Sequence, residues 1–343
     1  MKGRNNKYII GLVVVIIIST LYFSNKLILD KGIKPRGEKA TIYIPTGSTY
    51  SRVLDSLEKH LIIANRDIFN WVAQKKNYPS LVKAGRYVVE EKMSYFSLIN
   101  MLRSGSQEPV RLTFTSIRTV AQLAGRIGKQ IEADSARISD FLSDPENYRK
   151  DGFTRENVIS VFIPNTYEFY WNTSASGFYT RMLKEYRRFW TDARMSKARS
   201  EDLTPVEVAI LASIIDDEVA KGNEKPRIAG VYLNRLKRGI PLQACPTIKF
   251  ALNDFTITRV LNKHLQVDSP YNTYRHKGFP PGPIGCPTIE GLDAVLNAEK
   301  HDYLYFAAKA DFSGYHNFSR SLAEHNRYAN EYQRELDKRK IFK

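Results

Sequence analysis

The stretch TPVEVAILASIIDDEVAK, residues 204–221, sets three consecutive acids at the end of an otherwise apolar run. Thr204 and Glu207 have the spacing of a helix capping box. Pro205 stands at the first helical position, where its missing N–H removes no hydrogen bond. The pattern therefore predicts a helix that begins after Thr204 and carries the three acids in its last turn.

Glu218 differs from the two acids that precede it. At about 100° per residue, Glu218 falls on the apolar stripe of the predicted helix, whereas Asp216 and Asp217 point to either side of that stripe. A carboxyl on this face is desolvated, which raises its pKa toward the range of a general acid. Alternatively, the Glu218 stem packs on the core and its carboxylate pairs with Arg227 or Arg235. Position alone leaves both interpretations open.

Composition restricts the possible partners. The chain has 343 residues, of which 43% are hydrophobic, so it can fill a sizeable core and is not a disordered protein. Its 52 basic and 36 acidic residues give a formal net charge of +16. Such a charge suits an anionic partner, whether nucleic acid, a phospholipid surface or an acidic polymer. A glycine-rich phosphate loop is absent from the sequence, so nucleotide chemistry has no support.

The N-terminus predicts a membrane anchor. The run YIIGLVVVIIISTLYF, residues 8–23, together with the apolar residues 27–29, approaches the ~20 residues that a helix needs to cross a bilayer. A cleaved signal peptide fits less well, because no small-x-small cleavage site follows the run. We therefore expect a basic tail (residues 1–7), a transmembrane anchor (8–29) and a linker (30–39). Basic residues flank both sides of the span, so its orientation stays open.

Two domains are expected after the linker, in an α+β fold. Residues 40–108 predict a small unit in the order strand, helix, helix, strand, which resembles a LysM-type glycan-binding module, although any small α+β domain can share that order. Residues 109–343 predict a larger mixed α+β domain. Two of its segments, residues 269–288 and 303–326, are rich in Tyr, Asn, Thr, His and Gly on turn-prone backbone. This mixture is typical of a cleft that hydrogen-bonds and stacks on sugar.

Several motifs in the larger domain carry a family resemblance. They are LASIIDDEVAK (211–221), VYLNRL (231–236), PLQACPT (241–247), SPYNTY (269–274), GFPPGPI (278–284), HNF (316–318) and LAEHN (322–326). In this order they resemble the catalytic domain of the endolytic murein transglycosylases, inner-membrane enzymes that cut peptidoglycan strands internally. The resemblance places the catalytic glutamate at Glu218. The candidate substrate-binding residues in these motifs are Gln243, Thr247, Tyr271, Asn272, Thr273, Tyr274, His316, Asn317 and Asn326.

The resemblance also implies a mechanism. Glu218 protonates the glycosidic oxygen that leaves N-acetylmuramic acid, and its carboxylate then takes the proton of the C6 hydroxyl, which closes a 1,6-anhydro ring. A hydrolase usually needs a second carboxylate, and the cleft segments offer no comparable acid. We expect neither a cofactor nor a metal, because no histidines have ligand spacing. The alternatives are a water-using muramidase and a membrane-tethered glycan-binding protein without activity.

The resemblance further implies a location and partners. We expect a bacterial inner (cytoplasmic) membrane protein with a single span and its catalytic domain outside the cytoplasm, acting on nascent peptidoglycan strands. Peptidoglycan, the membrane and a peptidoglycan synthase are the expected partners, and nucleic acid is not.

The sequence departs from the family pattern at Cys245. The family's Gln-x-Asp-Pro-Thr reads Gln-Ala-Cys-Pro-Thr at residues 243–247, so the aspartate is missing. Cys245 and Cys286 are the only cysteines, and both precede a proline, which favours extended or turn backbone. In an oxidising compartment they can form a disulfide that ties the two loops together. The alternative is two unrelated small residues that each fill a tight space.

Overall fold

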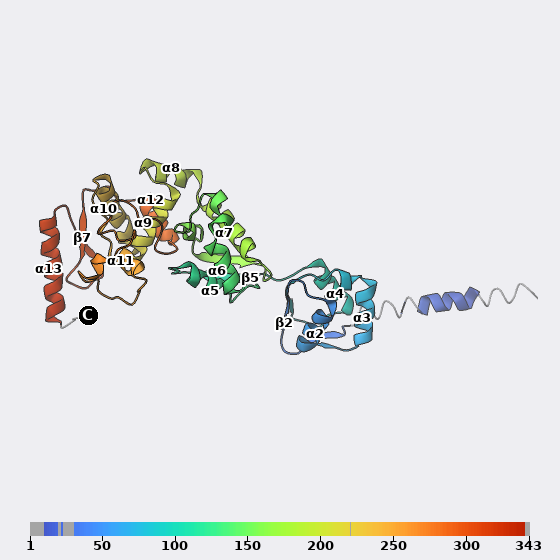
Figure 1. Cartoon of the computed structure of the whole chain (residues 1–343). Coiled ribbons are helices and arrows are strands. Elements are labelled where there is room, and N and C mark those ends of the chain that lie inside the picture. The colour runs from blue at the N-terminus through green and yellow to red at the C-terminus, as the bar shows by residue number, and fades with distance from the viewer. Residues whose placement is uncertain (1–9, 20–21, 23–30, 220, 340–343) are drawn as a thin grey trace, which may run out of the picture. The chain divides into compact units, whose positions relative to one another are not determined.

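The computed structural model describes residues 10–19, 22, 31–219 and 221–339. The chain divides into two compact units (Figure 1). Unit 1 takes in residues 1–111, 130–132 and 168–173, and unit 2 takes in residues 112–129, 133–167 and 174–343. Helices and short antiparallel strand pairs occur in both units, so the expected mixed α+β architecture is observed.

The predicted membrane anchor over residues 8–29 must be corrected. Residues 10–19 form a short helix with exposed side chains, and the part of the chain that the structure describes holds no helix long and apolar enough to span a bilayer. At about 1.5 Å per residue such a helix covers only about half of the hydrocarbon core. The rest of the predicted anchor, apart from residue 22, and the tail 1–7 lie outside the described residues. The expected single-pass membrane localisation depended on this anchor, so it is not supported either.

Between residues 31 and 108, unit 1 consists of two antiparallel strand pairs, three α-helices and the short 3₁₀ helix η1 (Tyr78–Ser80). Strand β1 pairs with β3, and β2 pairs with β4 in a register that sets Ile42 opposite Tyr87. Side-chain caps begin the helices at Thr49, Asn65 and Ser94. The predicted strand, two helices and strand are present as β2, α2, α3 and β4, but a short strand that was not predicted, β3, lies between the two helices. The LysM resemblance itself stays a prediction. The elements are β1 (Ile33–Pro35), β2 (Ala40–Ile44), α2 (Tyr50–His60), β3 (Leu61–Ile63), α3 (Arg66–Lys75), β4 (Gly85–Val89) and α4 (Tyr95–Ser104).

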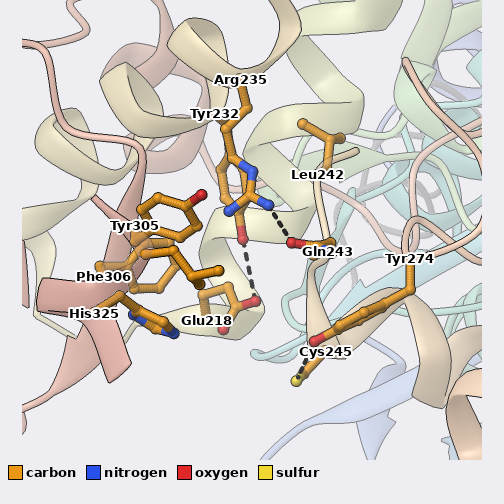
Figure 2. Close-up of a pocket in the computed structure, with 11 residues that line it drawn as sticks. Glu218, Tyr232, Arg235, Leu242, Gln243, Cys245, Tyr274, Tyr305, Phe306 and His325 are labelled. Atoms are coloured by element: carbon orange, nitrogen blue, oxygen red, sulfur yellow. Dashed lines mark hydrogen bonds between the residues drawn. The ribbon is translucent and has the colours of Figure 1, made fainter. Parts of the chain in front are cut away.

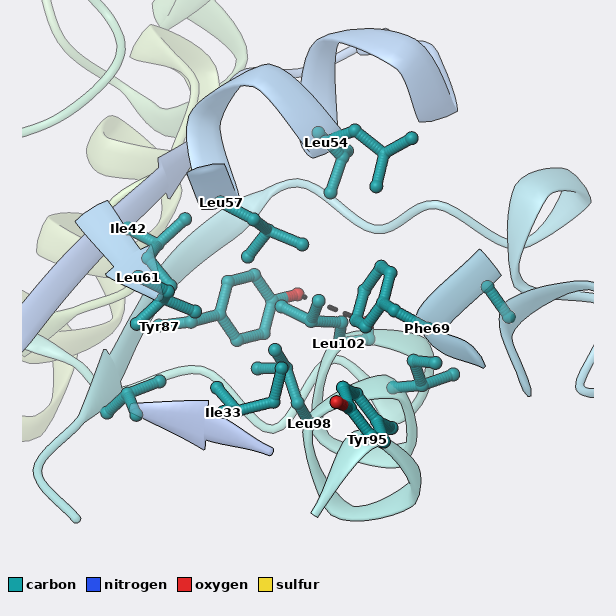
Figure 3. Packing of buried hydrophobic residues seen from close by; sticks show 14 of the residues in the cluster. Ile33, Ile42, Leu54, Leu57, Leu61, Phe69, Tyr87, Tyr95, Leu98 and Leu102 are labelled. Carbon is teal, nitrogen blue, oxygen red and sulfur yellow. Dashed lines mark hydrogen bonds between the residues drawn. The ribbon is translucent and has the colours of Figure 1, made fainter. Parts of the chain in front are cut away.

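Unit 1 has a hydrophobic core of its own (Figure 3). Every buried member of this core lies between Ile33 and Leu102. The Tyr87 ring lies at its centre, and its hydroxyl donates to the Lys83 carbonyl oxygen at 3.1 Å. The core therefore closes within one continuous stretch of chain.

The chain continues through a strand pair into the helices of unit 2. The first elements are β5 (Val110–Phe114), α5 (Val120–Ile127), α6 (Ser135–Ser143), β6 (Asn165–Phe169), α7 (Ala175–Phe189) and α8 (Asp192–Ser200), with β5 paired to β6. The later elements are α9 (Pro205–Glu218), the 3₁₀ turn η5 (Gly222–Glu224), α10 (Lys225–Lys237), α11 (Cys245–Ala251), α12 (Ile289–Leu296), the antiparallel pair β7 (Tyr305–Ala308) and β8 (His316–Ser319), and α13 (Leu322–Lys338).

Helix α9 is the central element of unit 2, and α10, α11 and α12 pack around it (Figure 1). Its predicted start is confirmed, because the Thr204 side chain accepts from the Glu207 N–H and the Glu207 carboxylate accepts from the Thr204 N–H. The predicted stripe is too narrow, since every residue from 208 to 215 is buried. The surrounding elements cover α9 on all sides over these residues. They leave a pocket at its end, where Glu218 is the last residue.

Candidate active site

A pocket of about 330 Å³ lies at the C-terminal end of α9 (Figure 2). Helices α9, α10, α11 and α13, strand β7 and the loops before α11 and α12 supply its walls. Polar and aromatic groups share its surface, and Glu218 is the only carboxyl among the described residues that line it. The lining residues are Glu218, Tyr232, Arg235, Leu242, Gln243, Cys245, Tyr274, Tyr305, Phe306, Leu322 and His325.

The Glu218 carboxyl is set up for proton transfer near neutral pH. Burial raises its pKa to about 7, and the charge of Asp217 acts in the same direction. The hydrogen bond that the Tyr232 hydroxyl donates to Oε1 at 3.2 Å acts against this rise, because it favours the carboxylate. Glu218 also ends α9, where the negative end of the helix dipole disfavours a second negative charge. Both protonation forms are therefore populated at neutral pH, so the group can give and take a proton.

The ion-pair alternative for Glu218 is not observed. Arg227 pairs with Glu299 at 2.9 Å. The buried Arg235 donates to the Pro241 carbonyl at 2.9 Å, to the Leu304 carbonyl at 3.1 Å and to the Gln243 side-chain oxygen. No cation of the described residues forms a salt bridge with the Glu218 carboxylate, which explains why burial dominates its pKa.

The other two acids of the run have different partners. The Asp216 carboxylate accepts from the Lys225 ammonium at 2.9 Å and from the N–H and hydroxyl of Thr288 at 2.7 and 2.9 Å. It therefore joins the end of α9 to the starts of α10 and α12. Asp217 forms a partly exposed ion pair with Arg118 at 3.1 Å. Both side chains point away from the pocket, as the helical spacing predicts.

Of the nine predicted substrate-binding residues, Gln243 and Tyr274 line the pocket. Gln243 has a left-handed backbone with a φ of 54°, an unfavourable conformation for a residue with a Cβ. Tyr274 lies on the same side of the pocket as Gln243, and the Tyr274 hydroxyl is 3.1 Å from the Cys245 sulfur (Figure 2). Both side chains come from loops that precede or follow α11, so only the tertiary fold brings them to Glu218.

Three further predicted residues lie behind the pocket wall as buried supports. The Thr247 and Thr273 hydroxyls form a hydrogen bond, with their oxygens 2.9 Å apart. The Thr273 hydroxyl also accepts from the Ala244 N–H at 3.0 Å. The Asn272 amide donates to the Leu265 and Val267 carbonyls at 2.9 and 2.8 Å. These hydrogen bonds hold the loops that carry Gln243 and Tyr274.

The four remaining candidates lie outside the residues that line the pocket. Tyr271 packs on Phe250, with ring centroids 4.7 Å apart. His316 pairs through Nδ1 with the buried carboxylate of Glu224 at 2.9 Å. Asn317 lies opposite Ala307 in the β7–β8 ladder, and Asn326 is exposed on α13.

Most of the other residues that line the pocket were not predicted from the sequence. Tyr232 and Arg235 both project from α10, and their i, i+3 spacing in VYLNRL is a signal that they share a face. His325 stacks on Tyr305 with centroids 5.4 Å apart, and burial lowers the pKa of its imidazole. Leu242, Tyr305, Phe306 and Leu322 carry no comparable signal, since apolar and aromatic residues are the ordinary content of a core.

The hypothesis of a disulfide between Cys245 and Cys286 is wrong in this structure, because both thiols are free. The Cys245 sulfur contacts Tyr274 in the pocket, whereas the buried Cys286 sulfur lies 3.9 Å from the Ile159 carbonyl oxygen. Burial raises the pKa of both thiols. The pocket therefore has a neutral thiol at the position where the family pattern has an aspartate.

Fold and site together define an α+β protein with an enzyme-like pocket around one titratable carboxyl. The chain belongs to the YceG-like family, whose sequence model matches residues 42–331. This confirms the family resemblance read from the motifs.

Two relatives and one solved structure align with most of this chain. An endolytic murein transglycosylase of Bacillus subtilis (strain 168) is 28% identical over 333 residues, which cover 92% of this chain and 91% of the relative. One of Streptococcus pneumoniae (strain D39) is 30% identical over 320 residues; the match covers 84% of this chain but 58% of the relative. A crystal structure of a YceG-like protein from Listeria monocytogenes has 30% identity and a TM-score of 0.56, and covers 84% of this chain and 98% of that chain.

Proposed function

We propose that this chain cleaves peptidoglycan glycan strands internally, as a lytic transglycosylase that leaves 1,6-anhydro-N-acetylmuramic acid ends. The observation that carries the proposal is Glu218, a carboxyl with a pKa raised to about 7 and no second carboxylate among the described residues of its pocket. A hydrolase with two acidic groups would need a partner for water activation or nucleophilic attack. Two similar proteins named as endolytic murein transglycosylases support the choice of polymer.

The proposed reaction uses Glu218 in both proton transfers. The protonated carboxyl gives its proton to the glycosidic oxygen while the bond from that oxygen to C1 of N-acetylmuramic acid breaks. The C6 hydroxyl oxygen of the same sugar then bonds to C1, and its proton passes to the Glu218 carboxylate. Atoms and charge balance without water, and Glu218 returns to its starting form. The Tyr232 hydroxyl and the Cys245 backbone both hydrogen-bond to the Glu218 carboxylate and hold it in place for the two transfers.

Two finer elements belong to the same proposal. Unit 1 is a LysM-like module that binds the glycan strand while the pocket cuts it, and the cuts terminate or release nascent strands made by a peptidoglycan synthase. The net charge of +16 suits a polymer whose stem peptides carry carboxylates.

The test compares wild-type protein with Glu218→Gln on purified peptidoglycan, with products identified by mass spectrometry. We expect anhydro-ended fragments of several disaccharides from wild-type protein and a loss of about 10²-fold or more in the variant, since a general acid typically contributes that much. Products with reducing ends would favour the muramidase. Glycan binding without any product would favour the inactive binding protein.

A further inference from the structure

The contact between Arg235 and Gln243 fixes which way the Gln243 amide faces. A guanidinium has only N–H donors, so the Gln243 atom that meets it must be the carbonyl oxygen, Oε1. Figure 2 shows this oxygen directed at Arg235. The amide NH₂ of Gln243 donates to no other described residue. Its two donors are therefore free for a group that enters the pocket.

Arg235 is itself held rigidly. It is 6% exposed, and its other hydrogen bonds go to the carbonyls of Pro241 and Leu304, which precede α11 and β7. The Gln243 backbone is also fixed, because its N–H donates to the Thr273 carbonyl at 3.0 Å. The left-handed φ of 54° persists only because these contacts determine it, and such conformations cluster at functional sites.

We propose that Arg235 orients Gln243 so that its amide donates a hydrogen bond to a carbonyl oxygen of the bound glycan, the oxygen of a 2-acetamido group. This inference rests on the proposed function and adds what the pocket recognises. A sugar hydroxyl both donates and accepts and would not require an amide of fixed orientation, whereas a carbonyl only accepts. Leu242 and Phe306 line the same pocket and offer apolar contact for the methyl group beside that carbonyl.

One other group of peptidoglycan has the same chemistry. The amide that joins the lactyl group of N-acetylmuramic acid to the stem peptide also presents a carbonyl oxygen near a methyl group. The experiment therefore needs three glycans: peptidoglycan oligosaccharides with acetamido groups and stem peptides, the same after de-N-acetylation, and an N-acetylglucosamine oligosaccharide, which keeps the acetamido groups but has no lactyl amide.

Binding is measured by calorimetry in the Glu218→Gln protein, so that no cleavage occurs. We expect the glycan that lacks the recognised carbonyl to bind about 3- to 10-fold more weakly, because water replaces the lost hydrogen bond at the exposed Gln243. Gln243→Glu retains an acceptor for Arg235 but removes both donors, so it should weaken binding of the intact glycan and abolish the preference. Gln243→Met, which lacks donors and acceptors, should lose the preference as well.

Gln333→Glu on α13 is the matched control. The Gln333 side-chain oxygen also accepts from an arginine, Arg259, at 3.1 Å, but this pair does not line the pocket. Affinity and preference should not change in this variant. Thermal unfolding of each variant checks that the fold is retained.

Each outcome has one meaning. Loss of affinity on de-N-acetylation that disappears in Gln243→Glu supports the acetamido carbonyl. The same pattern with the lactyl amide instead keeps the role of Gln243 but assigns the other carbonyl. Equal affinities of Gln243→Glu and its parent for all three glycans would overturn the inference. The proposed function fails separately, if wild-type protein yields no anhydro product from a glycan that the Glu218→Gln protein binds.

Discussion

Glu218 owes its raised pKa to the place where α9 ends rather than to a particular charged neighbour. Burial is the largest cause, and the hydrogen bond from Tyr232 works against it. Helical spacing selects Glu218 from among three acids because spacing is a local property of the sequence. The Tyr232 contact joins two helices, so only the folded chain reveals it.

The first prediction at the residue scale concerns Tyr232→Phe. The Tyr232 hydroxyl stabilises the Glu218 carboxylate, so its removal raises the pKa of Glu218 above the value of about 7. A general acid must be protonated, so activity falls as pH rises through this pKa. We therefore expect the alkaline limb of the kcat/KM profile to move to higher pH in Tyr232→Phe.

The control for this prediction is Tyr328→Phe, which removes a similar bond on α13. There the Tyr328 hydroxyl donates to the Glu324 carboxylate at 3.3 Å, and neither residue lines the pocket. Its profile should coincide with that of the wild-type protein. An alkaline limb that stays in place, or moves to lower pH, in Tyr232→Phe would contradict the assigned role.

At the scale of elements, Asp216 is the residue that joins three helices at the base of the site. Its carboxylate receives the ammonium of Lys225, whose side chain is 7% exposed, and two hydrogen bonds from Thr288 at the start of α12. Asp216 is thus a structural residue next to the proposed catalytic one. Its contribution should appear in stability rather than in chemistry.

The second prediction compares Asp216→Ala with Asp217→Ala. Removing Asp216 leaves a buried ammonium with one exposed partner, Glu290, and takes the acceptor away from the Thr288 N–H and hydroxyl, so we expect a loss of about 3 kcal/mol in the free energy of unfolding. Asp217 shares a partly exposed ion pair with Arg118, and its removal should cost less than about 1 kcal/mol. Urea unfolding measures both. Equal losses in the two variants would show that the Asp216 network does not hold the helices together.

The elements also show what the sequence can and cannot predict. The cap at Thr204 follows from spacing within a few residues and is confirmed. The pocket depends instead on loops whose backbone is set by distant hydrogen bonds, such as that from the Gln243 N–H to the Thr273 carbonyl. The family motifs marked Thr247 and Asn272 as ligand-binding candidates, but their side chains hydrogen-bond to buried backbone carbonyls instead.

At the scale of the whole molecule, each of the two compact units has buried residues of its own. Hydropathy alone predicted the N-terminal anchor, and the described residues 10–19 are too few for it. A composition window registers apolar side chains but does not show whether they form one helix. The separation of a first unit from the rest of the chain has a structural basis that the anchor lacks. The hydrophobic core of unit 1 uses no residue beyond Leu102.

The last prediction follows from this core. A fragment of residues 31–108 retains every buried residue of the unit 1 cluster, so we expect it to unfold in a single cooperative transition. If unit 1 is a glycan-binding module, the fragment should also sediment with purified peptidoglycan. Basic residues outnumber acidic ones in this segment, so non-specific attraction must be separated from sugar recognition. Salt screens exposed charges, and binding that persists at 0.5 M salt, where the Debye length falls to about 4 Å, is not driven by charge alone. A folded fragment that leaves the pellet as salt increases would remove the glycan-binding role from unit 1, while the proposed chemistry at Glu218 would stand.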